Sequence, residues 1–88
     1  MSNLIPKRVK LPYFVIRTRF VPQSKMSPES DAEFDYNVKT REGTIAILKS
    51  LSDEEKLACW IHEMHHALVD YSEMLYDEGL VKRTRRKK

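Results

Sequence analysis

The segment His62-Glu63-Met64-His65-His66 holds the side chains of this 88-residue chain that are best suited to chemistry. It fits the pattern H-E-x-x-H, in which two histidines stand four residues apart and a glutamate follows the first. On a helix, His66 lies about 40° round the axis from His62 and about 6 Å along it, so both imidazoles can bind one ion. The spacing predicts a shared metal site at His62 and His66.

Glu63 lies about 100° round the same helix from His62 and borders the sector that the two histidines occupy. A carboxylate in this position stands beside a bound metal ion without ligating it. From there it can take a proton from a water molecule that the metal ion activates. We therefore expect Glu63 to be the general base of a hydrolytic site.

A zinc site needs a third protein ligand, and a catalytic one leaves its fourth position to water. Glu73 lies about 10 Å from His66 along a straight helix, too far to share an ion. Asp77 and Glu78 stand just before a glycine, where the chain should leave the helix and could return. We favour Glu78, with Asp77 and Glu73 as alternatives. Asp70 could orient the His66 ring through a hydrogen bond.

Two other interpretations of these residues stay open. Cys59 stands three residues before His62 and could close a structural site with both histidines, although a lone cysteine in a helix is usually a small buried residue. A polar helix face could also contain this pattern by chance. If a metal binds, two imidazoles and a carboxylate suit iron, cobalt or manganese as well as zinc.

A long helix must position these side chains. Ser52 and Glu55 form the S-x-x-E pattern of a capping box, which predicts a helix that begins at Asp53. No proline or glycine follows until Gly79. Apolar residues recur at intervals of three and four and predict one stripe against a sheet: Leu57, Trp60, Ile61, Met64, Leu68, Tyr71 and Leu75.

The residues before the helix read as strands. Between Pro12 and Pro22 the alternation predicts a strand, and a polar loop follows over residues 22–31. A β-hairpin should follow, with strands at residues 34–38 and 44–48 and with Gly43 in the turn. In the strand between Pro12 and Pro22, four residues should share one face: Phe14, Ile16, Thr18 and Phe20. The predicted fold class is α+β, a three-stranded antiparallel sheet packed on a long C-terminal helix.

Charge is concentrated at the C-terminus. Residues 82–88 carry six positive charges and no negative one, and removing six from the net charge of +3 leaves residues 1–81 at −3. The folded part therefore gives no electrostatic reason to expect a nucleic-acid surface, whereas the tail could bind phosphates. We expect one domain over residues 1–81 and a basic tail over residues 82–88.

The chain shows no apolar run that could cross a bilayer and no secretory signal, so we expect no membrane partner and an intracellular location. Its single cysteine forms no internal disulfide, so packing or a bound ion must stabilise the small core. Oligomeric state and substrate identity are open at this stage.

From residue 5 to residue 78 the chain resembles the small, phage-encoded zinc metallopeptidases of the ImmA/IrrE-like group, which are gluzincin-type H-E-x-x-H proteins. The matching segments read Ile-Pro-Lys-Arg-Val-Lys, Thr-Ile-Ala-Ile-Leu, Leu-Ser-Asp-Glu-Glu-Lys-Leu and Ile-His-Glu-Met-His-His-Ala-Leu. The resemblance implies a zincin-like domain, a glutamate after the active-site helix as third ligand, which by spacing is Glu78, and a phage protein in the host cytoplasm.

The leading hypothesis is a zinc-dependent metallopeptidase that hydrolyses a peptide bond of a protein or peptide substrate. His62, His66 and Glu78 would hold Zn²⁺, and Glu63 would be the base. An extended substrate could pair with an edge offered by the strand at residues 44–48. The alternative is a non-catalytic, zinc-stabilised binding module whose basic tail engages nucleic acid or an acidic protein. A metal-free interaction protein is a third hypothesis.

Overall fold

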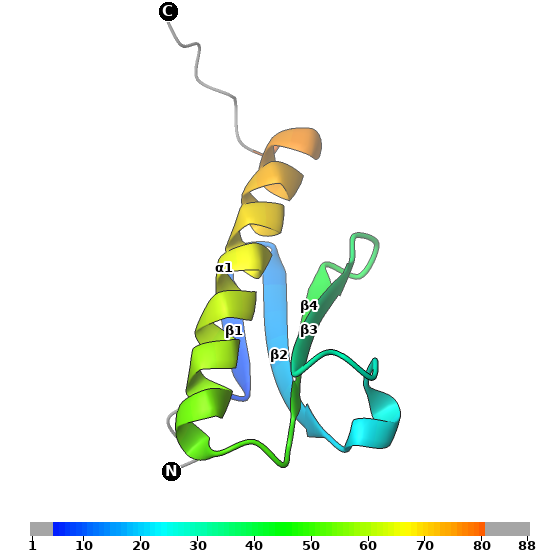
Figure 1. Cartoon of the computed structure of the whole chain (residues 1–88). Helices are drawn as coiled ribbons and strands as arrows, with labels where there is room; N and C mark the ends of the chain where they lie inside the picture. The colour runs from blue at the N-terminus through cyan, green and yellow to red at the C-terminus, as the bar shows by residue number, and fades with distance from the viewer. Residues whose placement is uncertain (1–4, 81–88) are drawn as a thin grey trace, which may run out of the picture.

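The computed structural model describes residues 5–80, which form one sheet and one long helix around a single core (Figure 1). The class is α+β, as predicted. The elements follow one another in the order β1 (Arg8–Leu11), β2 (Phe14–Val21), the 3-10 turn η2 (Gln23–Lys25), β3 (Ala32–Asn37), β4 (Glu42–Leu48) and α1 (Asp53–Asp77). The basic tail, residues 82–88, lies outside the described residues.

The sheet has four strands in the order β1-β2-β4-β3. β2 and β4 run parallel, whereas β1 with β2 and β3 with β4 run antiparallel. The prediction of a three-stranded antiparallel sheet is therefore wrong in strand number and in its central pair. β1 has only four residues between two prolines, but Val9 and Leu11 alternate with charged residues and pack against the core.

Composition explains why β4 takes the centre of the sheet. Ile45 and Ile47 of β4 are fully buried, whereas β3 carries Glu33 and Asp35. The ten-residue loop after β2 lets β3 pass outward and leaves room for β4 beside β2. The expectation that residues 44–48 offer a free edge is therefore wrong, because β4 is paired on both sides. The two edge strands of the sheet are β1 and β3.

The prediction for β2 is confirmed, since Phe14, Ile16 and Thr18 are buried and Phe20 is partly buried on the same face. Thr18 is the one buried polar residue of this face, and its hydroxyl oxygen accepts a 3.0 Å hydrogen bond from the indole N–H of Trp60. This bond joins β2 to α1 and satisfies both polar groups, which would otherwise be costly to bury.

The helix begins at Asp53, as predicted. The Ser52 hydroxyl accepts from the amide of Glu55, and the Glu55 carboxylate accepts from the amide of Ser52, which completes the capping box. The helix ends at Asp77, and Gly79 adopts a φ of 73°, a left-handed conformation that suits glycine after a helix.

Ala67 and Met74 are the buried residues of α1, and they pack on Ile16, Ile45 and Ile47 of the sheet. The predicted apolar stripe is correct for Trp60, Met64, Tyr71 and Leu75, which pack against this core, and wrong for Ile61 and Leu68. Those two side chains are 57% and 44% exposed. Both lie roughly 100° or more round the helix from Ala67, outside the face that touches the sheet.

The hairpin of β3 and β4 is confirmed, but Gly43 does not form its turn. Arg41 occupies the left-handed position there, with a φ of 59°, and Gly43 is a buried residue of β4. A Cβ atom on Gly43 would lie 2.8 Å from Cε1 of Phe34, closer than such atoms approach. Gly43 therefore makes room for an aromatic ring on the neighbouring strand.

Within residues 5–80, no helix combines the length and the apolar character that crossing a bilayer requires.

We expect Gly43→Ala to lower the free energy of unfolding by about 1–3 kcal/mol, because the added methyl group must displace the Phe34 ring. Chemical denaturation of Gly43→Ala, Phe34→Leu and the double variant measures this coupling. In the Phe34→Leu background the alanine should cost clearly less. An equal cost in both backgrounds would show that Phe34 is not the reason for the glycine.

Candidate metal centre

His62 and His66 lie one turn apart near the middle of α1, outside the buried face of the helix. Both side chains are exposed. Their Nε2 atoms are 3.2 Å apart, and their rings are nearly perpendicular, with centroids separated by 4.7 Å. The structure therefore brings together the two residues that the sequence pairs, with one ring nitrogen of each facing the other.

This spacing fits a shared metal ion. Two nitrogens that each lie about 2.0–2.1 Å from a tetrahedral zinc are about 3.3–3.4 Å apart. The observed 3.2 Å between the two Nε2 atoms is close to that separation. It is also a hydrogen-bond distance, so without a metal one imidazole N–H donates to the other nitrogen. The distance between the two nitrogens thus suits either state.

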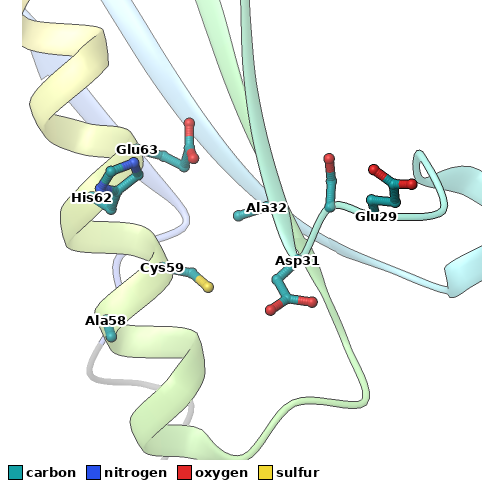
Figure 2. Close-up of a pocket in the computed structure, with 8 residues that line it drawn as sticks. Glu29, Asp31, Ala32, Ala58, Cys59, His62 and Glu63 are labelled. Atoms are coloured by element: carbon teal, nitrogen blue, oxygen red, sulfur yellow. The ribbon is translucent and has the colours of Figure 1, made fainter.

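Glu63 lies next to the pair and is partly buried. It lines a groove of about 420 Å³ between α1 and the chain that enters β3. Figure 2 shows its carboxylate projecting from the helix toward the strands. The groove is lined by Glu29, Ser30, Asp31, Ala32, Ala58, Cys59, His62 and Glu63.

Three of the groove residues carry carboxylates, and none is a lysine or an arginine. The H-E-x-x-H pattern predicts the helix side of this groove but not Glu29, Asp31 or Ala32 on its other wall. These residues belong to a polar loop and to the first position of β3. Only the pairing of β3 at the sheet edge brings them opposite His62 and Glu63.

Cys59 is partly buried beside the histidines, and its sulfur points toward Asp31 in Figure 2. Burial raises the pKa of this thiol, and the carboxylates of Asp31 and Glu63 raise it further. Metal ligation requires the thiolate, which these surroundings disfavour. These surroundings favour the neutral thiol of a packed cysteine.

The structure does not bring Glu78, the favoured third ligand, to the histidines. α1 continues without a break to Asp77, which leaves Glu78 twelve residues, or about 18 Å along the axis, from His66. The carboxylate of Glu78 accepts a 3.2 Å hydrogen bond from the Arg41 guanidinium. It therefore joins the end of the helix to the hairpin turn.

The other candidates are no nearer. Asp77 and Glu73 are on the same straight helix, about 16 Å and 10 Å from His66 along the axis. No hydrogen bond joins Asp70 to His66 within the described residues. Among residues 5–80, no three histidine, cysteine, aspartate or glutamate side chains are close enough together to hold a metal ion. The histidine pair thus supplies two protein ligands in this conformation.

No family model, no curated protein and no solved structure matches this chain. The case for a metal site therefore depends on the H-E-x-x-H pattern and on the geometry described above.

Because Glu78 is bound to Arg41 far from the histidines, we expect Glu78→Gln to leave zinc affinity unchanged, as measured by titration against a zinc chelator. Loss of this exposed ion pair should cost at most about 1 kcal/mol of stability. Arg41→Gln is the matched control, since it breaks the same pair from the other side. If Glu78→Gln weakened zinc binding and Arg41→Gln did not, the end of α1 would have to unwind to supply a ligand.

Proposed function

We propose that this chain is a zinc-dependent metallopeptidase in which His62 and His66 bind the metal and Glu63 is the general base. The observation that carries the proposal is the 3.2 Å separation of the two Nε2 atoms, with the partly buried residue Glu63 directly after His62 on the helix. The H-E-x-x-H segment lies on an unbroken helix that packs on a sheet. On a helix, this pattern places two histidines on one face, where they can bind zinc.

Each residue would have a distinct role in hydrolysis. When bound, zinc would polarise the scissile carbonyl and lower the pKa of water. His62 and His66 would hold it at the mouth of the groove. Glu63 would accept the proton of the attacking water and pass it to the leaving amine, the two-way transfer that one positioned carboxylate can perform.

The substrate would enter along β3. This strand is the sheet edge beside the groove, so an extended peptide could pair with its backbone and pass His62 and Glu63. Glu29, Asp31 and Glu63 make the groove acidic, which favours substrates that carry lysine or arginine near the cleaved bond.

Two imidazoles are one fewer protein ligand than catalytic zinc sites usually have. In the conformation described, the remaining positions would fall to water and substrate. We therefore expect zinc to bind less tightly than at a complete three-ligand site. A weak but specific affinity that depends on both histidines is the signature of the proposed centre.

Three variants test the proposal. His66→Ala should lose zinc, whereas Glu63→Gln should keep zinc and lose about 10²- to 10⁴-fold in the rate of peptide cleavage, because only the proton transfer is removed. His65→Ala, a histidine on the same helix outside the pair, is the control and should keep both properties. The measurements are zinc affinity, by titration against a zinc chelator, and mass spectrometry of a peptide library, in which cleaved bonds should be enriched in neighbouring basic residues.

Zinc bound equally by His66→Ala and the parent chain would contradict the proposed ligands. Cleavage that survives Glu63→Gln would contradict the proposed base. Zinc binding through both histidines with no cleavage of any library would favour the alternative, a zinc-stabilised binding module.

A further inference from the structure

The face of the sheet that points away from α1 separates its charges by strand. Arg8 and Lys10 of β1 and Arg17 and Arg19 of β2 are all exposed. They alternate with residues that pack in the core, so all four lie on the opposite face. We call these four residues the basic strip. Glu33 and Asp35 lie on the same face, but on β3.

The register places β4 between the basic strip and the acidic residues of β3, while Glu42 of β4 lies on the same face next to β2. One row across the sheet reads Arg8, Arg17, Thr44 and Asp35, so the strands that carry the cations and β3 are separated by β4. Neighbouring strands are about 4.8 Å apart, which places Asp35 about 10 Å from Arg17 at the level of the backbone. The residue between them is a neutral threonine.

The basic strip has few internal partners. Arg17 has a 3.7 Å ion pair with Glu42, and both side chains are nearly half exposed. Within residues 5–80, Arg8, Lys10 and Arg19 have no acidic side chain at ion-pair distance. Arg8 stands directly opposite Arg17 on the neighbouring strand, and two like charges in such a pair destabilise a sheet.

The net charge of the folded part does not indicate this local basic surface. Residues 1–81 sum to −3, which argued against a nucleic-acid surface on the folded part. Much of the negative charge lies on β3 and α1, however, so the average says little about β1 and β2. An alternation such as Arg17-Thr18-Arg19 predicts two cations on one face, but only the pairing with β1 brings the other two beside them.

We propose that the basic strip binds the phosphate backbone of a nucleic acid without reading its sequence. Four cations on two adjacent strands offer a narrow row of donors, which suits a linear polyanion. The face offers no aromatic side chain for stacking on bases, since Phe14, Phe20, Phe34 and Tyr36 alternate with its residues and point the other way. The same lack of large apolar side chains argues against insertion into a lipid surface.

This proposal is independent of the proposed metallopeptidase activity. The basic strip lies on the sheet face that points away from α1, whereas the histidine pair lies on α1 itself. It also differs from binding through residues 82–88, which remain intact in every variant below.

The test is the salt dependence of binding to labelled duplex DNA, measured by fluorescence anisotropy on the full chain. Arg17→Gln with Arg19→Gln should reduce the slope of log affinity against log salt by about 1.8, since each lost phosphate contact contributes about 0.9. The control, Lys25→Gln with Lys39→Gln, removes the same charge from η2 and from the hairpin turn. It should leave the slope unchanged. Arg17→Lys with Arg19→Lys changes the same two side chains but keeps their charge. It should keep the parent slope, which would show that the loss in the glutamine variant comes from charge and not from misfolding.

An equal slope for the strip and control variants would overturn the proposal and assign binding to the tail. So would binding to phosphatidylserine vesicles that depends on Arg17 and Arg19 while DNA binding does not. The absence of any DNA binding by the parent chain at low salt would overturn it as well.

Discussion

The packing of α1 on the sheet fixes everything that the candidate site can do. Ala67 and Met74 rest on Ile16, Ile45 and Ile47, and this contact sets the rotation of the helix about its axis. With 100° between successive residues, once Ala67 faces the sheet the directions of His62, Glu63 and His66 are determined. The imidazoles then face outward, and the glutamate falls at the border where helix and edge strand meet.

The same constraint explains the limits of the site. A helix held along most of its length cannot bend to bring its own C-terminal carboxylates back to its middle. The Glu78 contact with Arg41 holds the end of α1 near the hairpin turn, where Leu80 also packs against the core. Glu78, the ligand that the spacing favours, thus pairs with Arg41 in this conformation. The groove, in contrast, gains its second wall from β3.

The sequence predicts the local features well and the assembly of strands poorly. The capping box of Ser52 and Glu55, the facing pattern of β2 and the relation of His62 to His66 follow from short-range periodicity, which depends only on backbone geometry. The order of the strands depends instead on which strand best tolerates burial on both edges. In this chain β4 is a central strand and β3 is an edge strand. This order determines which loop residues line the groove. Gly43 shows the same limit, because its role depends on Phe34 across the pairing rather than on its own neighbours in the chain.

The central claim is that His62 and His66 bind one zinc ion together. X-ray absorption spectroscopy of the zinc-loaded chain tests it most directly, because imidazole rings give characteristic multiple scattering. The account predicts two imidazole nitrogens at about 2.0–2.1 Å, lighter oxygen or nitrogen atoms in the remaining positions, and no sulfur at about 2.3 Å. A spectrum without imidazole scattering, or one with a sulfur ligand from Cys59, would contradict it.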